Sequence, residues 1–185
     1  MQHSYNFEQM LSGGHPNSLG NTVEVVEIVL GDRALLENLY TCYFSQDEVV
    51  RLRTSNAMKR ICQKQPQWLV AYIDRFLTEV SQIEQPSAQW TLAQLFARLD
   101  RYISEQQLER AKVILKHNLT NYSDWIVLNT TIETLGKWSK QDTDLSIWLK
   151  PYLEELSSDR RKSVAGRAKK IIKLLYSIKN YKEVF

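Results

Sequence analysis

The sequence predicts an all-α protein built from stacked helix pairs, and three observations carry this prediction. Within residues 45–80, apolar side chains recur every three or four positions, which places them on one face of an α-helix. Pro66 divides this stretch into two helices joined by a short turn. Helix-starting residues then recur at intervals of 39, 38 and 35 positions, near Asp47, Pro86, Asp124 and Asp159. Two helices cannot bury their apolar faces on each other alone, so we expect the successive pairs of a helical solenoid.

The elements follow in order along the chain. Residues 1–20 are expected to be a loosely structured segment, because SGGHPNSLG has the composition of a loop. Asn21 and Thr22 are expected to start a short helix that ends at Gly31. The predicted helix pairs then cover residues 32–44 with 47–64, 67–83 with 86–102, 104–120 with 123–139, and 144–157 with 159–179. Residues 21–185 are thus predicted to form one helical-repeat domain.

Each later helix has its own apolar face. The helix over 67–83 carries Leu69, Tyr72, Ile73, Phe76, Leu77 and Val80. The helix over 86–102 carries Leu92, Leu95, Phe96, Leu99 and Ile103, and the last helix carries Val164, Ala168, Ile171, Ile172 and Leu175. These spacings predict the buried side of each helix.

Two segments resemble the HEAT-repeat family. HEAT motifs have a proline in the first helix, an aspartate at the turn, and Val-Arg followed by small residues in the second helix. The last pair supplies Pro151, Asp159, Val164, Ala165 and Ala168, and an earlier pair supplies Asp47, Leu52, Arg53 and Ala57. The sequence departs from the pattern where Ala165 replaces the arginine, and the middle repeats keep only Asp124 or nothing.

The resemblance implies an α-α superhelix of about four helix pairs with an extra N-terminal helix, and armadillo-like packing is a near neighbour. In the family the aspartate and arginine form a structural ladder between repeats, and the second helices line a concave surface. We expect the same arrangement over about residues 32–180.

Bulk properties exclude several classes of protein. A chain of 185 residues can bury a core without disulfides or a structural metal. It contains no run of about 18 apolar residues and no signal-peptide pattern at its N-terminus, so we expect a cytoplasmic protein without membrane partners. Cys42 and Cys62 match no metal or redox spacing and are expected to be buried thiols.

The sequence shows no catalytic or metal-binding motif. His3, His15 and His117 lack neighbouring ligands at metal-binding spacing, and no nucleophile elbow, zinc-protease motif or phosphate loop occurs. We therefore predict a non-enzymatic protein with no metal and no cofactor.

The aromatic residues indicate a candidate binding surface. Trp68, Trp125 and Trp148 lie beside apolar residues near helix starts, which predicts packing. Trp90 falls on the side of its helix opposite the apolar face. On a concave surface, its neighbours would complete a partner-binding set of Arg53, Arg60, Trp90, Gln94, Arg98 and Arg101. Alternatively, Trp90 packs under the N-terminal segment or a neighbouring helix.

Positive charge is concentrated in the last helix. Residues 159–185 hold nine Lys or Arg and two acids, a net charge of +7, whereas the first 158 residues hold 15 basic and 19 acidic residues, a net charge of −4. The predicted basic patch comprises Lys162, Arg167, Lys169, Lys170 and Lys173. It could follow a phosphate backbone or an acidic partner, or be the solvated face of a capping repeat.

The leading hypothesis is a non-catalytic scaffold that binds a protein or peptide, as a monomer or weak dimer. The alternative is nucleic-acid binding, because some HEAT-like alkyl-purine glycosylases bind DNA with exposed tryptophans and an essential aspartate. Asp124, Trp125 and Trp90 offer those residue types, but a DNA groove needs basic residues on several repeats. A third hypothesis is an assistant in enzyme or pigment assembly, as in phycobilin lyase subunits.

Overall fold

The computed structural model describes residues 5–182, with side chains described as far as Tyr176, and every regular element in that range is a helix. The all-α prediction is thereby confirmed. The chain divides into two compact units, Met1–Ile103 and Ser104–Phe185. None of the helices described between residues 5 and 182 is long and apolar enough to cross a membrane.

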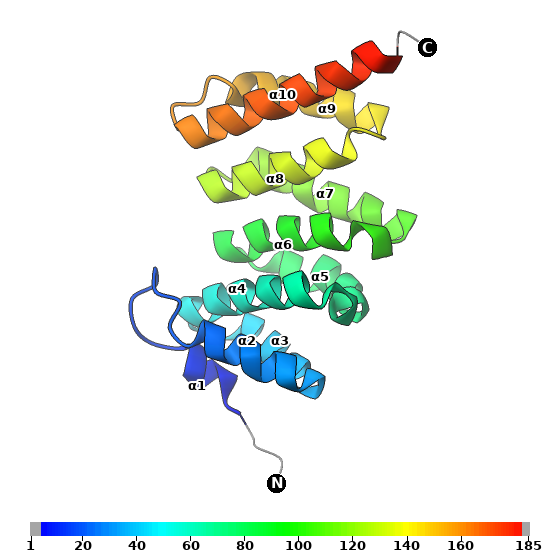
Figure 1. The fold of residues 1–185 in the computed structure, drawn as a ribbon. Coiled ribbons are helices and arrows are strands. Elements are labelled where there is room, and N and C mark those ends of the chain that lie inside the picture. The colour runs from blue at the N-terminus through cyan, green and yellow to red at the C-terminus, as the bar shows by residue number, and fades with distance from the viewer. Residues whose placement is uncertain (1–4, 183–185) are drawn as a thin grey trace. The chain divides into compact units, whose positions relative to one another are not determined.

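The first unit is a stack of helices in two layers. Its elements are α1 (Phe7–Leu11), α2 (Thr22–Gly31), η1 (Arg33–Leu35), α3 (Leu36–Thr41), η2 (Cys42–Phe44), α4 (Glu48–Lys64), η3 (Pro66–Tyr72), α5 (Ile73–Thr78), η4 (Val80–Gln82), α6 (Pro86–Leu99) and η5 (Asp100–Tyr102). Figure 1 shows α2, α4 and α6 stacked in one layer, with α3 and α5 behind them. Helix α4 contacts both α2 and α6.

Local chemistry explains where α4 and α6 begin. Asp47 caps α4, since its carboxylate accepts a hydrogen bond of 2.8 Å from the backbone N–H of Val49. Pro86 occupies the first turn of α6, where a backbone N–H has no acceptor within the helix, so its absence in proline costs no hydrogen bond. The predicted apolar faces are buried in both helices, including Met58 and Phe96. These starts and faces match the sequence prediction.

The helices that precede α4 and α6 are interrupted. The predicted continuous helices over 32–44 and 67–83 are each divided into a short α-helix flanked by 3-10 turns. Over segments this short, apolar spacing cannot distinguish a 3-10 helix, with three residues per turn, from an α-helix, with 3.6. The sequence therefore predicted that these segments are helical but not which type of helix they form.

The N-terminal segment is anchored to the rest of the first unit. Phe7 and Leu11 of α1 are buried, and Asn6 caps this helix by accepting a bond of 3.0 Å from the Gln9 N–H. The hydroxyl of Ser45 donates to Glu8 at 2.6 Å. Residues 5–20, which we expected to be loosely structured, are therefore packed against the rest of the first unit, because α1 contributes two apolar side chains to its core.

The second unit contains two helix pairs. They are α7 (Glu105–Asn121) with α8 (Trp125–Trp138), and α9 (Thr143–Leu156) with α10 (Lys162–Lys182). Figure 1 shows α8 and α10 in front of α7 and α9, and α10 contacts both α8 and α9. Ser104 and Gln107 form a capping box on α7, and Asp124 and Asp142 cap α8 and α9.

Helices α8 and α10 pack closely because one of them lacks a side chain at the crossing. A Cβ atom on Gly136 would come within 2.5 Å of the Cγ2 of Ile171. Val164, Ala168 and Ile171 are buried, as predicted for the inner face of α10. Ile172 and Leu175, predicted on the same face, are only half-buried.

Candidate ligand-binding surface

Helices α4 and α6 are held side by side at their starts by one glutamine. Gln85 accepts a hydrogen bond of 2.6 Å from the Arg51 side chain and donates one of 3.0 Å to the carbonyl of Glu48. The pairing of residues near 48–51 with residue 85 fixes the register of the two helices. Residues about 11 to 13 positions beyond Glu48 on α4 and beyond Gln85 on α6 therefore also lie near one another.

Three basic side chains meet at that level of the α4–α6 pair. Lys59 and Arg60 come from α4, and Arg98 comes from α6; we call them the cationic cluster. Burial lowers the pKa of Lys59, and the charges of Arg60 and Arg98 lower it further. Arg60 donates to the Asn56 side chain at 2.8 Å. No acidic residue within the described part of the chain forms an ion pair with any of the three.

Trp90 and Gln94 continue this surface along α6. Trp90, Gln94 and Arg98 are spaced four residues apart, which places them in one row on the helix. Trp90 and Gln94 are half-buried, and Arg98 is exposed. From Trp90 to Arg98 the row spans about 12 Å. The row joins an aromatic side chain, an amide and a guanidinium on one accessible helix face.

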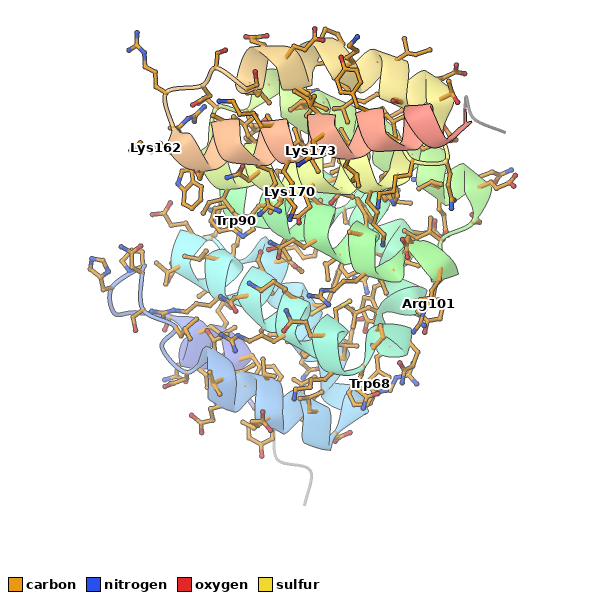
Figure 2. The ribbon with its side chains drawn as sticks, turned by 45° about the horizontal axis from the view of Figure 1, so that its top comes forward. Trp68, Trp90, Arg101, Lys162, Lys170 and Lys173 are labelled. Atoms are coloured by element: carbon orange, nitrogen blue, oxygen red, sulfur yellow. The ribbon has the colours of Figure 1, made fainter. Side chains whose placement is uncertain are left out.

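Arg101 lies apart from the row. It belongs to η5, is exposed, and donates to the Tyr102 hydroxyl at 2.8 Å. Its guanidinium also lies 4.7 Å from the centre of the Tyr102 ring. Figure 2 shows Trp90 and Arg101 towards opposite ends of α6.

Arg53 does not belong to an exposed surface, contrary to our expectation. Only 2% of the residue is exposed. Its guanidinium donates to the backbone carbonyls of the N-terminal loop, at 2.6–3.3 Å, from Leu11, Ser12, Gly13, His15 and Ser18. The expected ladder partner was an aspartate of another repeat, but the loop carbonyls compensate this buried charge instead.

A second polar cluster in the first unit ties two helical segments together. Arg75 of α5 pairs with Glu37 at 2.8 Å and with Glu79 at 3.1 Å, and its guanidinium lies 3.9 Å from the centre of the Tyr40 ring. The Tyr72 hydroxyl donates to Glu37 at 3.0 Å. Burial, followed by this bond and the charge of Glu37, raises the pKa of Tyr72 to about 12. Arg75 thus bridges two carboxylates, and the pair that it forms with Glu37 stabilises the packing of α3 against α5.

The predicted basic patch occupies α10 of the second unit. Lys162, Lys169, Lys170 and Lys173 are exposed, and Figure 2 marks Lys162, Lys170 and Lys173 along the helix. Arg167 differs, because it forms an ion pair with Glu133 of α8. The structure thus places four lysines of the patch on the surface and uses its arginine to join two helices.

The other tryptophans differ in their environments. Trp68 is half-buried, and its ring centre lies 5.9 Å from the Arg33 guanidinium. The ring centres of Trp148 and Tyr152 are 4.6 Å apart, with the two rings tilted by 37°. Both fit the predicted packing role. Trp125 does not, since it is the first residue of α8 and 49% exposed. A residue in the first turn projects beyond the helix start, which the pattern of apolar neighbours did not indicate.

The remaining reactive side chains form no additional centre in the described residues. Cys42 and Cys62 are buried free thiols, as predicted. No three His, Cys, Asp or Glu side chains between residues 5 and 176 come together as a potential metal site.

Sequence reasoning missed Lys59. The only signal was its position beside Arg60, and the spacing within α4 could not show which of the two faces α6. That choice depends on the register set by Gln85.

No protein-family model, no curated protein and no solved structure matches this chain.

Proposed function

We propose that this chain is a non-catalytic helical-repeat binding protein, HEAT- or armadillo-like, that binds an acidic segment of a partner protein. The binding surface is formed by the cationic cluster together with Trp90 and Gln94, and we call it the α4–α6 face. The repeat interval of 35–39 residues supports this architecture. The contacts of α4 with α6, and of α10 with α8, also support it, because these are the second helices of successive pairs.

The observation that carries the proposal is the cationic cluster without acidic partners. Burial, and then the positive charges of Arg60 and Arg98, disfavour the charged form of Lys59 and lower its pKa. Carboxylates of a bound peptide would supply the missing opposite charge. Trp90 and Gln94 lie along the same row and offer an apolar contact and an amide for the peptide backbone. Tryptophan and arginine are the residue types that dominate protein-binding hot spots.

The direct test is a titration in which the full chain binds a fluorescent Glu-rich peptide that contains one leucine. The fluorescence anisotropy of the peptide measures its binding, at low and at physiological salt. Arg98→Gln is expected to weaken binding about three- to fivefold at low salt. Trp90→Ala should weaken it at both salt concentrations, because the aromatic contact is not screened. Thermal unfolding of both variants controls for folding, since a cation in the last turn also stabilises its helix.

A second candidate function, nucleic-acid binding by α10, rests on its exposed lysines. Lys162, Lys169 and Lys170 have no ion-pair partner among residues 5–176. A row of lysines along a helix can follow phosphates, with an affinity that falls steeply as salt increases. The corresponding probe is a fluorescent DNA duplex under the same conditions.

The two candidates are separated by exchanging the variants between the assays. Arg98→Gln and Lys169→Gln each remove one positive charge from the chain. If the peptide binds the α4–α6 face, Arg98→Gln weakens peptide binding and Lys169→Gln leaves it unchanged. Equal weakening by both variants would indicate attraction to net charge alone and would contradict a defined site. Saturable binding of duplex, lost only with Lys169→Gln, would favour the second candidate.

A further inference from the structure

A groove in the second unit has the dimensions of a small-molecule site. It lies between α9 and α10 and reaches the end of α8, with a volume of about 500 Å³. Its α9 side extends from Thr143 to Leu153, ten residues apart and therefore about 15 Å long. Sites for small ligands commonly have volumes of about 300–1,000 Å³ and combine an apolar wall with a few oriented polar groups.

The apolar wall of the groove is incompletely covered by the side chains of residues 5–176. Leu153 is buried, Ile172 and Leu175 are half-buried, and Ile147 and Tyr176 are 67% and 51% exposed. Several large apolar side chains thus converge on one accessible hollow. Exposed apolar surface that gathers in this way is typical of a place where a ligand binds.

The polar groups of the groove are suited to an anion. Lys140 and Lys150 contribute ammonium groups, and Thr143 and Ser146 contribute hydroxyls. Neither hydroxyl forms a side-chain hydrogen bond within the described residues, and Lys140 has no ion-pair partner there. Lys150 lies 3.7 Å from Glu154 and 5.8 Å from the centre of the Tyr176 ring. Two cations and two free donors therefore border the apolar wall.

We infer that the α9–α10 groove binds a small carboxylate with an alkyl or acyl chain. The carboxylate would accept hydrogen bonds from the lysines and the two hydroxyls, which are stronger when one partner is charged. The chain would cover Ile147, Ile172 and Tyr176. This site is in a different unit from the α4–α6 face, so it does not depend on the function proposed for that face.

The test is calorimetric titration of the full chain with octanoate, decanoate and dodecanoate, each below its micelle concentration. Affinity is expected to rise about fourfold for each added methylene until the apolar wall is covered. Decyltrimethylammonium has the same chain length as decanoate and the opposite charge, and it should bind at least tenfold more weakly. Lys150→Gln should reduce decanoate affinity about five- to tenfold and reduce this preference for the anion.

A matched pair of surface variants locates the site. Ile147 in the groove and Val113 on α7 are both 67% exposed, so aspartate at either position should leave folding intact. Ile147→Asp should abolish decanoate binding by placing a carboxylate in the groove, whereas Val113→Asp should leave it unchanged. Equal affinity for the carboxylate and the ammonium, or equal effects of the two variants, would overturn the inference. So would an absence of decanoate binding combined with binding of an acidic helical peptide.

Discussion

Gly20 lies directly over the guanidinium of Arg53. A Cβ atom at Gly20 would come within 2.8 Å of the Arg53 Cζ, closer than non-bonded carbon atoms approach. The φ angle of Gly20 is +49°, a left-handed conformation that other residues rarely adopt. The loop can therefore surround a buried arginine with carbonyl groups only because this position has no side chain.

Gly20→Ala is expected to destabilise the protein by about 2–3 kcal/mol, since it combines a left-handed backbone with a steric conflict. Gly13→Ala is the matched control: its φ is +70°, but nothing lies within 4 Å of a Cβ there. Gly13→Ala should lower the free energy of unfolding by only about 1–2 kcal/mol, which is the cost of the left-handed backbone conformation alone. Urea unfolding measures both, and equal losses would contradict the role of Arg53 in restricting position 20.

Gly136→Ala should destabilise the second unit by about 1–3 kcal/mol, because the new methyl group would overlap Ile171 at the α8–α10 crossing. Gly166→Ala on α10 is the control, as nothing lies within 4 Å of a Cβ at this helical position. That control should stabilise by about 0.5–1 kcal/mol through helix propensity.

A double-mutant cycle with Ile171→Ala tests the contact itself. Removing the Ile171 side chain makes room for the methyl group, so the double variant should lose less stability than the sum of the single losses. Simple additivity would show that Gly136 is not restricted by Ile171.

Stability in acid should depend on the pair of Lys112 and Asp142. Lys112 Nζ lies 2.6 Å from the carboxylate of Asp142, and this hydrogen bond lowers the Asp142 pKa. A lowered pKa contributes stability that is present above the unfolded value of about 4 and is lost as pH falls through the folded value. For Lys112, burial lowers the pKa, but hydrogen bonds to Asp142 and Glu109 outweigh it and raise the pKa. The Lys112 contribution is thus lost only above about pH 10.5.

Asp142→Asn should therefore cost about 1–2 kcal/mol at pH 7 and much less at pH 2–3. Asparagine still caps α9, so the variant isolates the charge. Asp47→Asn is the control, because Asp47 caps α4 without an ion pair in the described residues. Unfolding in urea at several pH values measures the difference, and a cost for Asp142→Asn that is independent of pH would contradict the prediction.

The two cysteines should react slowly while the protein is folded. Burial raises the pKa of each thiol to about 11, with a smaller contribution from Glu8 at Cys42. Since the thiolate is the reactive form, a disulfide reagent at pH 8 should modify both far more slowly than in guanidinium, and faster as pH rises towards 11. A thiol that reacts within seconds in the native protein at pH 8 would contradict this.

Helix positions were determined by the sequence to a large degree, because they depend on local chemistry. Asp47, Asp124 and Pro86 start helices through groups that lie within three residues of them, and the apolar faces follow from residues three or four apart. Such interactions can be identified from a short stretch of sequence alone. The prediction failed only at the first helices of the first two pairs, whose 3-10 turns share the same apolar spacing as an α-helix.

The candidate sites were determined only by tertiary structure. Arg53 and Arg60 are equally basic in the sequence, but Arg53 meets carbonyls 35–42 residues away and is buried, while Arg60 joins the cationic cluster. Lys59 meets Arg98 through the register of two helices. Ile172 and Leu175 continue the apolar face of α10, yet they line a groove because α9 does not cover them. Helical periodicity specifies which side of a helix a residue occupies, whereas the neighbouring segment decides whether that side is covered, paired or open.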